Sequence, residues 1–593
     1  MRQAPGFLWL FVACAVVVAA AALAGCAARV EPADLVLHNG KIATVDTARP
    51  SAQALAVRGD SIVALGTDEE INAYIGDKTQ VIDLAGKLAI PGLIDSHLHF
   101  MGVGEQKLQL DLTKAKNWDD IVAMVAEAVK TTPPGQPIRG RGWHQEKWDK
   151  VPVPNIEGFP LHDALSKVSP NNPVYLTHAS GHATIANAKA MELAGITKKT
   201  ADPPGGDLVR DKQGNPIGVF RENGARLLRA RAGTVPETTP EQAEAQARKV
   251  LDLAVQECLS KGVTTAHDAG AGFQTVDLYK KAADEKKLGV RLNVMVNSGN
   301  ESLRQNLAKY KMIGYGDKHL TVRTIKRVLD GALGSRTAWL LEPYSDLPAA
   351  PAPAAMTTAN KAAQPVVAAT GIETMPIPEL ADTAKIAIEN DFQLAVHAIG
   401  DRANREALNV FEEAFKAHPD KKDVRWRIEH AQHINAADIP RFGQLGVIAS
   451  MQGIHCTSDG PYVLLRLGAQ RAEEGAYVWQ KLMKSGALVA NGTDAPVEAV
   501  DAIPGFYALV TRKMKNGEAF YPDQRMTRED ALKAYTLNGA YSAFEEAVKG
   551  SLAPGKLADI TILSKDILTI PEDEILKTEV LYTIVGGRVL YKK

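Results

Sequence analysis

The residues of this chain that are best suited to chemistry are histidines and one aspartate that follow apolar, strand-like segments. In AIPGLIDSHLHF, residues 89–100, an apolar run ends in His97 and His99. Because side chains alternate along an extended strand, Asp95, His97 and His99 project from one face. Neutral imidazole is a preferred zinc ligand, so two such rings at a strand end can hold one metal ion. The spacing alone is equally compatible with two hydrogen-bonded loop histidines.

Four further candidates stand in later apolar segments: Lys326 in TIKRVLDG, His397 in QLAVHAIGD, His430 in VRWRIEHAQ and Asp494 in LVANGTDAP. Each has an ordinary structural explanation. His397 fits a hydrogen-bonded core histidine, Asp494 a helix N-cap, and Lys326 a solvated basic face. Alternation along the segment of His430 places this imidazole on the apolar face with Trp426, an unusual neighbourhood for an unpaired ring. The opposite face would carry Arg425, Arg427 and Glu429.

Eight short apolar segments, with helical stretches between them, would position these side chains. They are AIPGLIDSHLHF, GVTTAHDAG, GVRLNVMVN, TVRTIKRVLDG, QLAVHAIGD, VRWRIEHAQ, GVIASMQGIH and LVANGTDAP. Alternation of strands and helices is typical of parallel βα units, and eight units predict a closed barrel. Barrel enzymes carry their chemistry at the carboxyl ends of the strands, where these histidines and the carboxylate would meet. As a set, the residues indicate a metal centre in the barrel mouth.

The other segments frame the barrel. The stretch from the first barrel strand to the second is too long for one crossover, so residues 105–235 are predicted to be an insertion. Short alternating segments at the two chain ends predict one small β domain, because either end alone has too few strands. The Ala/Pro-rich residues 346–371 are expected to form a loop, and we favour a spacer over a lid. The boundaries are 34–88 with 546–593 for the β domain, and 89–104 with 236–545 for the barrel.

Composition excludes some function classes. With 45% hydrophobic and 23% charged residues, the chain has the composition of a globular protein. A formal net charge of −1 gives no electrostatic footprint for nucleic acid or for an acidic membrane surface. We therefore expect a small-molecule substrate and no nucleic-acid partner; the oligomeric state is left open.

The N-terminus is predicted to be a targeting segment. An apolar run over residues 7–25 is long enough to span a bilayer as a retained helix. However, LAGC at residues 23–26 resembles the bacterial lipoprotein signal, which is cleaved before a lipidated cysteine, and we favour that interpretation. Residues 1–25 would then be the signal peptide and residues 26–33 a tether lipidated at Cys26. The protein would be exported and membrane-anchored outside the cytoplasm, in the periplasm if Gram-negative.

An ordered set of phrases carries a family resemblance. The phrases are IPGLIDSHLH, RGWHQEKW, SGHATIAN, DPPGGDLVRDKQGNPIGVF, KRVLDGALGSRTA, HAIGDRAN, RIEHAQ, GTDAP and GSLAPGKLADITIL. From about residue 34 to the end, the chain resembles the metal-dependent amidohydrolase superfamily, and within it the amidohydrolase 3 branch that includes N-substituted formamide deformylase-like proteins. Gly453, Thr493 and His144 stand where the branch commonly has Pro, Ser and Asp. The last departure puts an inherited substrate preference in doubt.

The resemblance implies a fold and a set of ligands. The fold would be a deformed (β/α)8 TIM-like barrel with a composite β-sandwich from both chain ends and an insertion after the first barrel strand. His97 and His99 would hold one metal ion and His397 and His430 a second. Lys326, carbamylated at its amine, would bridge two divalent ions, which we expect to be zinc. Asp494 would bind metal and carry protons.

The resemblance also implies a mechanism. Two divalent ions lower the pKa of a shared water, and the resulting hydroxide attacks a polarised carbonyl. Asp494 would then deliver the proton to the departing amine, because an amide anion is a poor leaving group. Candidates for shaping the substrate pocket are Trp143, His144, His182, Arg336 and His455, although ordinary loop packing explains each equally well.

Three functional hypotheses follow. The first is a hydrolase of a carbon–nitrogen bond in a small amide or formamide-like compound. The second is a single-metal deaminase of the same superfamily, which would not need Lys326 as a ligand; HAIGD lacks the His-x-x-Glu spacing of the aromatic-base deaminases. The third is a lipoprotein that binds a solute or a metal without turnover. A proton-carrying Asp494 beside the metal argues against a passive binder.

Overall fold

The computed structural model describes residues 30–230, 239–347 and 369–593. Cys26, the predicted lipid anchor, and most of the Ala/Pro-rich stretch 346–371 lie outside the described residues. Within the described ranges, no helix is long and apolar enough to cross a bilayer.

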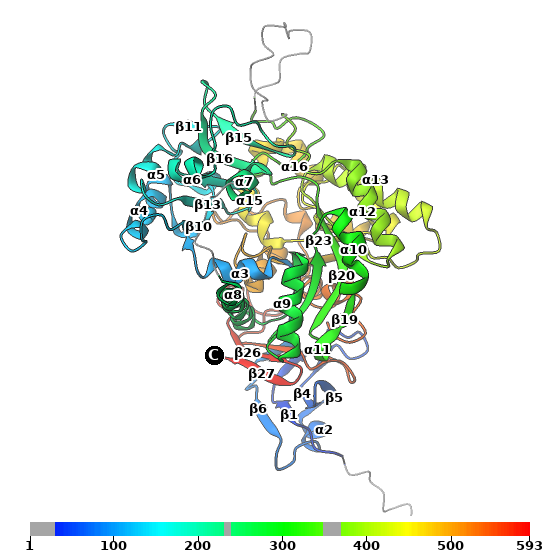
Figure 1. Ribbon diagram of the computed structural model, residues 1–593. Coiled ribbons are helices and arrows are strands. Elements are labelled where there is room, and N and C mark those ends of the chain that lie inside the picture. Colours follow the sequence, from blue (N-terminus) through cyan, green and yellow to red (C-terminus); the bar gives the residue numbers. More distant parts are fainter. Residues whose placement is uncertain (1–29, 231–238, 348–368) are drawn as a thin grey trace, which may run out of the picture.

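Eight parallel strands form the central sheet (Figure 1). In order along the sheet they are β8 (Leu93–Leu98), β17 (Val263–Ala271), β18 (Arg291–Val296), β20 (Leu320–Val328), β21 (Gln393–Ala398), β22 (Arg427–His430), β23 (Ile448–Met451) and β24 (Val489–Asn491). A short strand, β19 (Met312–Gly314), pairs antiparallel with β20. The spatial order follows the chain order, as in a barrel built from successive βα units.

The barrel closes through the segment that follows β24. The backbone N–H of Asp494 donates to the carbonyl of His97 over 2.7 Å, and that of His99 donates to the carbonyl of Ala495 over 2.7 Å. The Thr493 hydroxyl donates to the Asp95 carboxylate over 2.5 Å. These bonds hold the last strand end against the first, so the two catalytic candidates His97 and Asp494 become neighbours although almost four hundred residues separate them.

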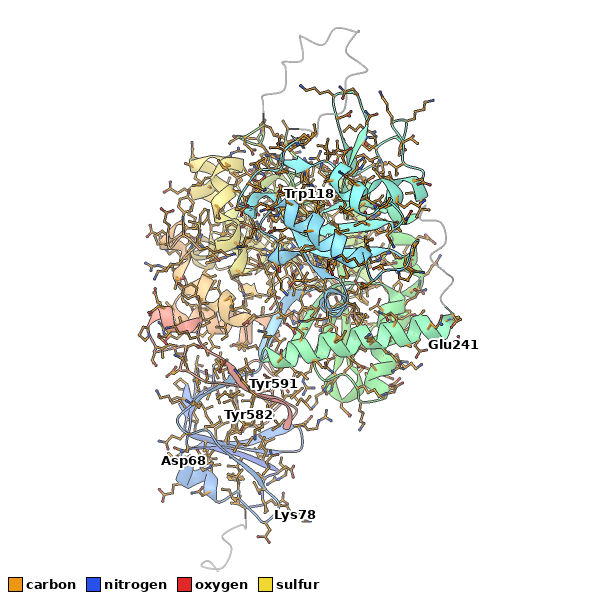
Figure 2. The ribbon with its side chains drawn as sticks, turned by 90° about the vertical axis from the view of Figure 1, so that its left-hand side faces the viewer. Asp68, Lys78, Trp118, Glu241, Tyr582 and Tyr591 are labelled. Atoms are coloured by element: carbon orange, nitrogen blue, oxygen red, sulfur yellow. The ribbon has the colours of Figure 1, made fainter. Side chains whose placement is uncertain are left out.

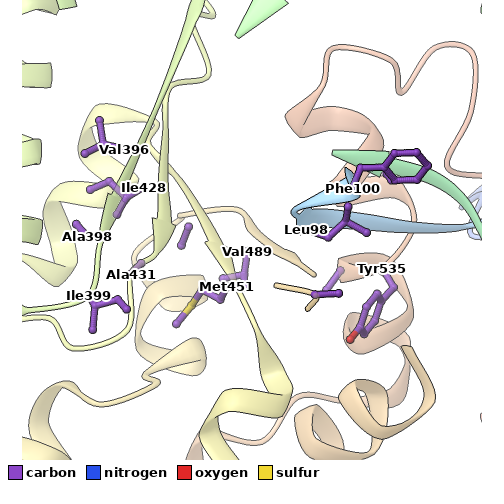
Figure 3. Close-up of a cluster of buried hydrophobic side chains, with 14 of the residues drawn as sticks. Leu98, Phe100, Val396, Ala398, Ile399, Ile428, Ala431, Met451, Val489 and Tyr535 are labelled. Atoms are coloured by element: carbon purple, nitrogen blue, oxygen red, sulfur yellow. The ribbon is translucent and has the colours of Figure 1, made fainter. Parts of the chain in front are cut away.

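Helices cover the outside of the barrel. They include α8 (Pro240–Ser260), α9 (Phe273–Asp284), α10 (Asn300–Tyr310), α12 (Ile377–Glu389), α13 (Asp401–Ala417), α14 (Ile439–Leu445), α15 (Gly453–Leu467) and α18 (Ala502–Thr511). Strands under helices are buried on both faces and therefore read as continuous apolar runs. Figure 3 shows part of this core, with Val396, Ile428, Met451 and Val489 on successive strands.

Both chain ends build one β-sandwich below the barrel. Figure 2 shows Asp68 from the N-terminal part and Tyr582 from the C-terminal part in this region. One sheet has the order β5 (Ser61–Gly66), β4 (Ala54–Arg58), β1 (Leu35–His38), β6 (Gln80–Asp83). The other has the order β27 (Arg588–Lys592), β26 (Val580–Val585), β25 (Ile560–Leu563), β7 (Leu88–Pro91), β2 (Lys41–Ala43), β3 (Ser51–Ala52). Apolar side chains from both sheets share one core.

The chain segment between β8 and β17 forms a separate sheet. Its order is β15 (Gly206–Arg210), β16 (Pro216–Glu222), β14 (Ala183–Ala186), β13 (Val174–His178), β10 (Ile138–Trp143), β9 (Leu110–Asp111). It packs on α4 (Trp118–Val129) and α5 (Asp163–Val168) through its own apolar core. The predicted fold class, a deformed barrel with additional flanking sheets, is therefore confirmed.

Candidate metal centre

Asp494 lies at the centre of a group of imidazoles, of which His97, His430 and His455 are buried and His99 is partly exposed. Its Oδ1 is 3.5 Å from His97 Nε2 and 3.4 Å from His99 Nε2. Its Oδ2 is 3.9 Å from a ring nitrogen of His430 and 3.9 Å from His455 Nε2. Burial alone opposes ionisation of this carboxyl, but the neighbouring imidazoles of His430, His97 and His99 hold its pKa well below the usual range. Asp494 is therefore a carboxylate in this site.

His97 is oriented from behind by Glu429. The Nδ1 atom of His97 contacts the Oε2 of Glu429, and Arg427 Nε donates to Glu429 Oε1 over 2.7 Å. The backbone carbonyl of Ser96 and the hydroxyl of Ser450 accept from the same guanidinium. Burial raises the pKa of Glu429, but Arg427 and His97 lower this pKa by a larger amount. The carboxylate therefore stays charged. With Nδ1 bonded to a carboxylate, His97 presents the Nε2 lone pair to the centre.

His430 and His397 complete the imidazole group. Their ring centroids are 4.4 Å apart, and the His430 ring is 4.7 Å from that of His97. Burial lowers the pKa of both side chains well below the usual value for histidine. Burial therefore favours the neutral form of both rings, which is the form that binds a metal ion.

Lys326 points into the barrel beside this group. Lys326 is 2% exposed. Burial lowers the pKa of its amine to about 8, although the nearby carboxylates of Glu429 and Asp494 raise this pKa. The side chains of the two nearby arginines point out of the barrel. Arg323 lies over the ring of Phe544, and Arg327 donates to Thr383 on α12. Lys326 therefore does not belong to a solvated basic face.

The donors present fit a divalent metal ion. His97, His430 and Asp494 each offer one ligand atom, and these atoms lie within 4.8 Å of one another. Within the described chain, His97 Nε2 and Asp494 Oδ1 are buried and have no hydrogen-bond partner. Buried polar atoms are almost always satisfied, so these two unpaired atoms, 3.5 Å apart, fit a shared cation. Imidazole nitrogens with a carboxylate are ligands that zinc and related ions prefer.

A cavity opens from this centre toward the insertion. The predicted pocket residues His144, His182 and His455 line it, as do His397 and Asp494. The remaining polar lining consists of Lys147, Ser180, Gln432, Asp459, Tyr462 and Glu498. His182 approaches the metal centre from the insertion: its ring centroid is 5.0 Å from that of His397. The insertion therefore supplies a wall of the substrate pocket.

Two predicted pocket residues lie elsewhere. Trp143 is fully buried in the core of the insertion, where its indole N–H donates to the carbonyl of Leu176 over 2.8 Å. Arg336 donates to the carbonyl of Glu157 and to the carboxylate of Asp346, each over 2.9 Å, and so ties two loops together. Neither side chain lines the cavity, and both placements favour packing roles.

The predicted alternation of side chains along β22 is wrong at the end of the strand. Trp426 packs on Phe411 of α13, outside the barrel, whereas Arg427 and Glu429 point inward. His430 was expected on the face of Trp426, yet it joins the inward group. The reason is its backbone: His430 and Ala431 have φ values of 75° and 43°, which end the extended conformation and turn the ring toward the centre.

Sequence reasoning missed three carboxylates that position histidines of the site. Besides Glu429, Asp330 accepts the backbone N–H groups of Ile399 and Gly400, and its Oδ1 is 3.5 Å from His397 Nε2. Glu222, at the end of β16, accepts from His182 Nδ1 over 2.8 Å. A carboxylate at the end of a strand was the available signal for Glu222 and Glu429, but their partners come from distant strands.

Removal of metal should destabilise the fold. A ligand that binds only the native state stabilises it by about 4 kcal/mol at a thousandfold excess over its Kd. We expect dialysis against a chelator to lower the apparent Tm in calorimetry, and zinc to restore it. An unchanged Tm after metal analysis has shown complete removal would contradict a metal centre at these buried ligands.

Comparison with known proteins places the chain in a family. The pattern of the amidohydrolase family matches residues 80–591. The chain is 34% identical to protein LONG AFTER FAR-RED 3 of Arabidopsis thaliana, over 94% of this chain and 92% of that protein. It is 30% identical to the putative amidohydrolase YtcJ of Bacillus subtilis (strain 168), over 94% and 99%. It is 25% identical to an N-substituted formamide deformylase of Arthrobacter pascens, over 94% and 98%.

Solved structures agree with these relatives. The fold is similar to that of an uncharacterized metal-dependent hydrolase from Pyrococcus horikoshii, with a TM-score of 0.69 and 25% identity over 91% of this chain and 99% of that one. The imidazole nitrogens of His97 and His99 around the Asp494 carboxylate are suitable ligands for the metal ion of such a hydrolase. The chain belongs to the amidohydrolase family and is a metal-dependent hydrolase that acts on carbon–nitrogen bonds.

Proposed function

We propose that this enzyme hydrolyses the carbon–nitrogen bond of a small amide or formamide-like substrate. The observation that carries the proposal is the ionised Asp494, which touches the metal-ligand candidates on one side and lines the substrate cavity on the other. The similarity to an N-substituted formamide deformylase supports this substrate class.

Two zinc ions are proposed as the resident cofactor. His97 and His99 would hold one ion, His397 and His430 the other, and Asp494 would bind on the cavity side. Lys326 would bridge them after its neutral amine has added carbon dioxide, and the pKa of about 8 makes that neutral form accessible near neutral pH. When bound, divalent cations supply Lewis acidity and lower the pKa of water toward neutrality.

The protein's own groups would move the proton. Asp494 is placed to accept it from the attacking water and to deliver it to the leaving nitrogen. His182 faces the same cavity, and Glu222 fixes its Nδ1. Burial opposes the charged form of His182, but Glu222 raises its pKa above the usual value. A protonated His182 can therefore donate a hydrogen bond to the substrate through Nε2.

Screening of hydrolysis tests the proposal. Metal-replete enzyme should release amine from at least one class among N-formyl amines, acylated amino acids and cyclic amides. A fully metallated protein that binds members of this panel without hydrolysing any would instead be a solute-binding protein.

Lys326→Met should halve the metal content. The variant keeps an aliphatic chain of similar length but cannot form a carbamate, so we expect about two ions per chain to fall to about one. A carbamate signal from 13C-bicarbonate in NMR should also disappear. Lys147→Met, which changes a cavity lysine away from the metal ligands, is the control and should retain both. One ion per chain in the unmodified enzyme would favour the single-metal deaminase.

We further propose that the chain is a bacterial lipoprotein anchored through Cys26, with its catalytic domain outside the cytoplasm. The proposal rests on the LAGC sequence after the apolar run. Metabolic labelling with palmitate should mark the intact protein and leave a Cys26→Ser variant unlabelled. A labelled Cys26→Ser variant would contradict it.

A further inference from the structure

One face of the insertion sheet is polar and carries two arginines. On β10, Arg139 and Arg141 project from the same side, while Ile138 and Gly140 face the apolar core. The register pairs Arg139 with Tyr175 and Arg141 with Thr177 on β13. Thr177 in turn pairs with Thr184 on β14. Two guanidinium groups, a phenol and two hydroxyls therefore form a contiguous patch across three strands.

This patch is the wall of a large cavity. The cavity has a volume of about 840 Å³, and residues of β10, β13, α3 (Phe100–Gln106) and α8 line it. Figure 1 shows α3 and α8 below β10 and β13. Glu105 of α3, Gln246 of α8 and Pro496 also line it. The space is large enough for a metabolite-sized ligand.

The arginines have hydrogen-bonding capacity to spare. Within the described chain, no carboxylate lies within 4.0 Å of either guanidinium, and Arg139 makes no hydrogen bond, its guanidinium lying 5.1 Å from the Tyr175 ring. Arg141 donates only to carbonyls, through Nη2 to Ala179 over 3.1 Å and through Nε to Pro496 over 3.4 Å. Burial lowers the pKa of Arg141, and the more distant Asp494 and Glu105 carboxylates act in the opposite direction.

We propose that this cavity binds a small organic or inorganic oxyanion, a carboxylate or a phosphate, between Arg139 and Arg141. A planar guanidinium matches both groups with two parallel hydrogen bonds. Thr177 and Thr184 add neutral donors beside the arginines. Among the lining side chains, the two arginines outnumber the one carboxylate, Glu105, which favours an anionic ligand.

The cavity beside Arg139 and Arg141 and the catalytic pocket lie on opposite sides of the same chain segments. Residues 179, 180 and 182 line the catalytic pocket, whereas Gly181 between them lines this cavity. Likewise Asp494 and Val497 face the catalytic pocket and Pro496 the cavity. Arg141 bonds to the segment that carries Asp494. The oxyanion site is therefore separate from the metal centre but shares its wall, as an effector site would.

Calorimetric titration of the metal-replete enzyme with inorganic phosphate and with succinate tests the site. We expect saturable binding of at least one probe, with an affinity that Arg139→Gln reduces about tenfold or more. Lys114→Gln removes a positive charge from the same domain outside the cavity and should leave the affinity unchanged. The two probes distinguish a phosphate ligand from a carboxylate.

Binding at the metal centre is distinguished by the same variants. An anion held by the metal ions would bind Arg139→Gln as tightly as the unaltered enzyme, and that result would overturn the proposal. So would the absence of saturable binding of both probes below about 10 mM. Loss of binding in Arg139→Gln with unchanged metal content and an unchanged Tm would establish the site.

Discussion

Asp494→Asn should lower kcat by about a thousandfold or more while most of the metal stays bound. General acid–base catalysis contributes about 10²–10⁴-fold on its own, and here the same group also faces the metal ligands. Asparagine keeps the shape of the side chain but cannot accept and return a proton. The other proposed ligands, the histidines and Lys326, are unchanged in this variant. Turnover of the best substrate from the screen, with metal content measured in parallel, provides the readout.

Glu498→Gln is the matched control for that experiment. Glu498 lines the same cavity and also loses a charge, but its partner is Lys147, 3.4 Å away, rather than a metal-ligand candidate. We expect it to change kcat by less than about tenfold. If Asp494→Asn retained the activity of the unaltered enzyme, Asp494 would have no part in proton transfer.

The barrel and its rim could be predicted because they depend on local signals. Apolar runs at regular intervals set eight strands, and the carboxyl ends of parallel strands must lie at one rim. His97, His99, His397, His430 and Asp494 follow these runs directly, so their convergence needs no knowledge of helix packing. Lys326 lies within its strand, flanked by two arginines, and only burial separates it from them.

The residues that orient the ligands could not be predicted in the same way. Glu429 touches His97 across more than three hundred residues, and Glu222 reaches His182 from another strand of the insertion. No spacing of residues in the sequence predicts either contact. The positive φ of His430 is similarly invisible in RIEHAQ, where strict alternation gives the wrong face. Trp143 is predicted in the substrate pocket, but it packs in the apolar core of the insertion, and no local sequence signal distinguishes the two places.

Glu429→Gln should weaken both the fold and the metal site. Glu429 is fully buried between Arg427 and His97, so the amide leaves a buried guanidinium without its counter-charge, at about 3–5 kcal/mol of unfolding free energy. The amide has one acceptor oxygen where Glu429 uses two, so it cannot accept from both Arg427 and His97, and loss of such a partner of a ligand histidine lowers metal affinity by about 10–100-fold. Competition with a chromophoric chelator and denaturant unfolding measure the two effects separately.

Asp559→Asn separates the two roles of Glu429. Asp559 forms a second buried pair, with Arg291 Nε at 2.7 Å, where the barrel meets the β-sandwich. The same chemical change there should destabilise the protein to a similar extent but leave metal affinity unaltered, because no metal-ligand candidate touches that pair. Equal metal affinities for Glu429→Gln and Asp559→Asn would show that Glu429 contributes to stability only and not to metal binding. A difference of tenfold or more would show that the charge behind His97 sets the strength of the metal site.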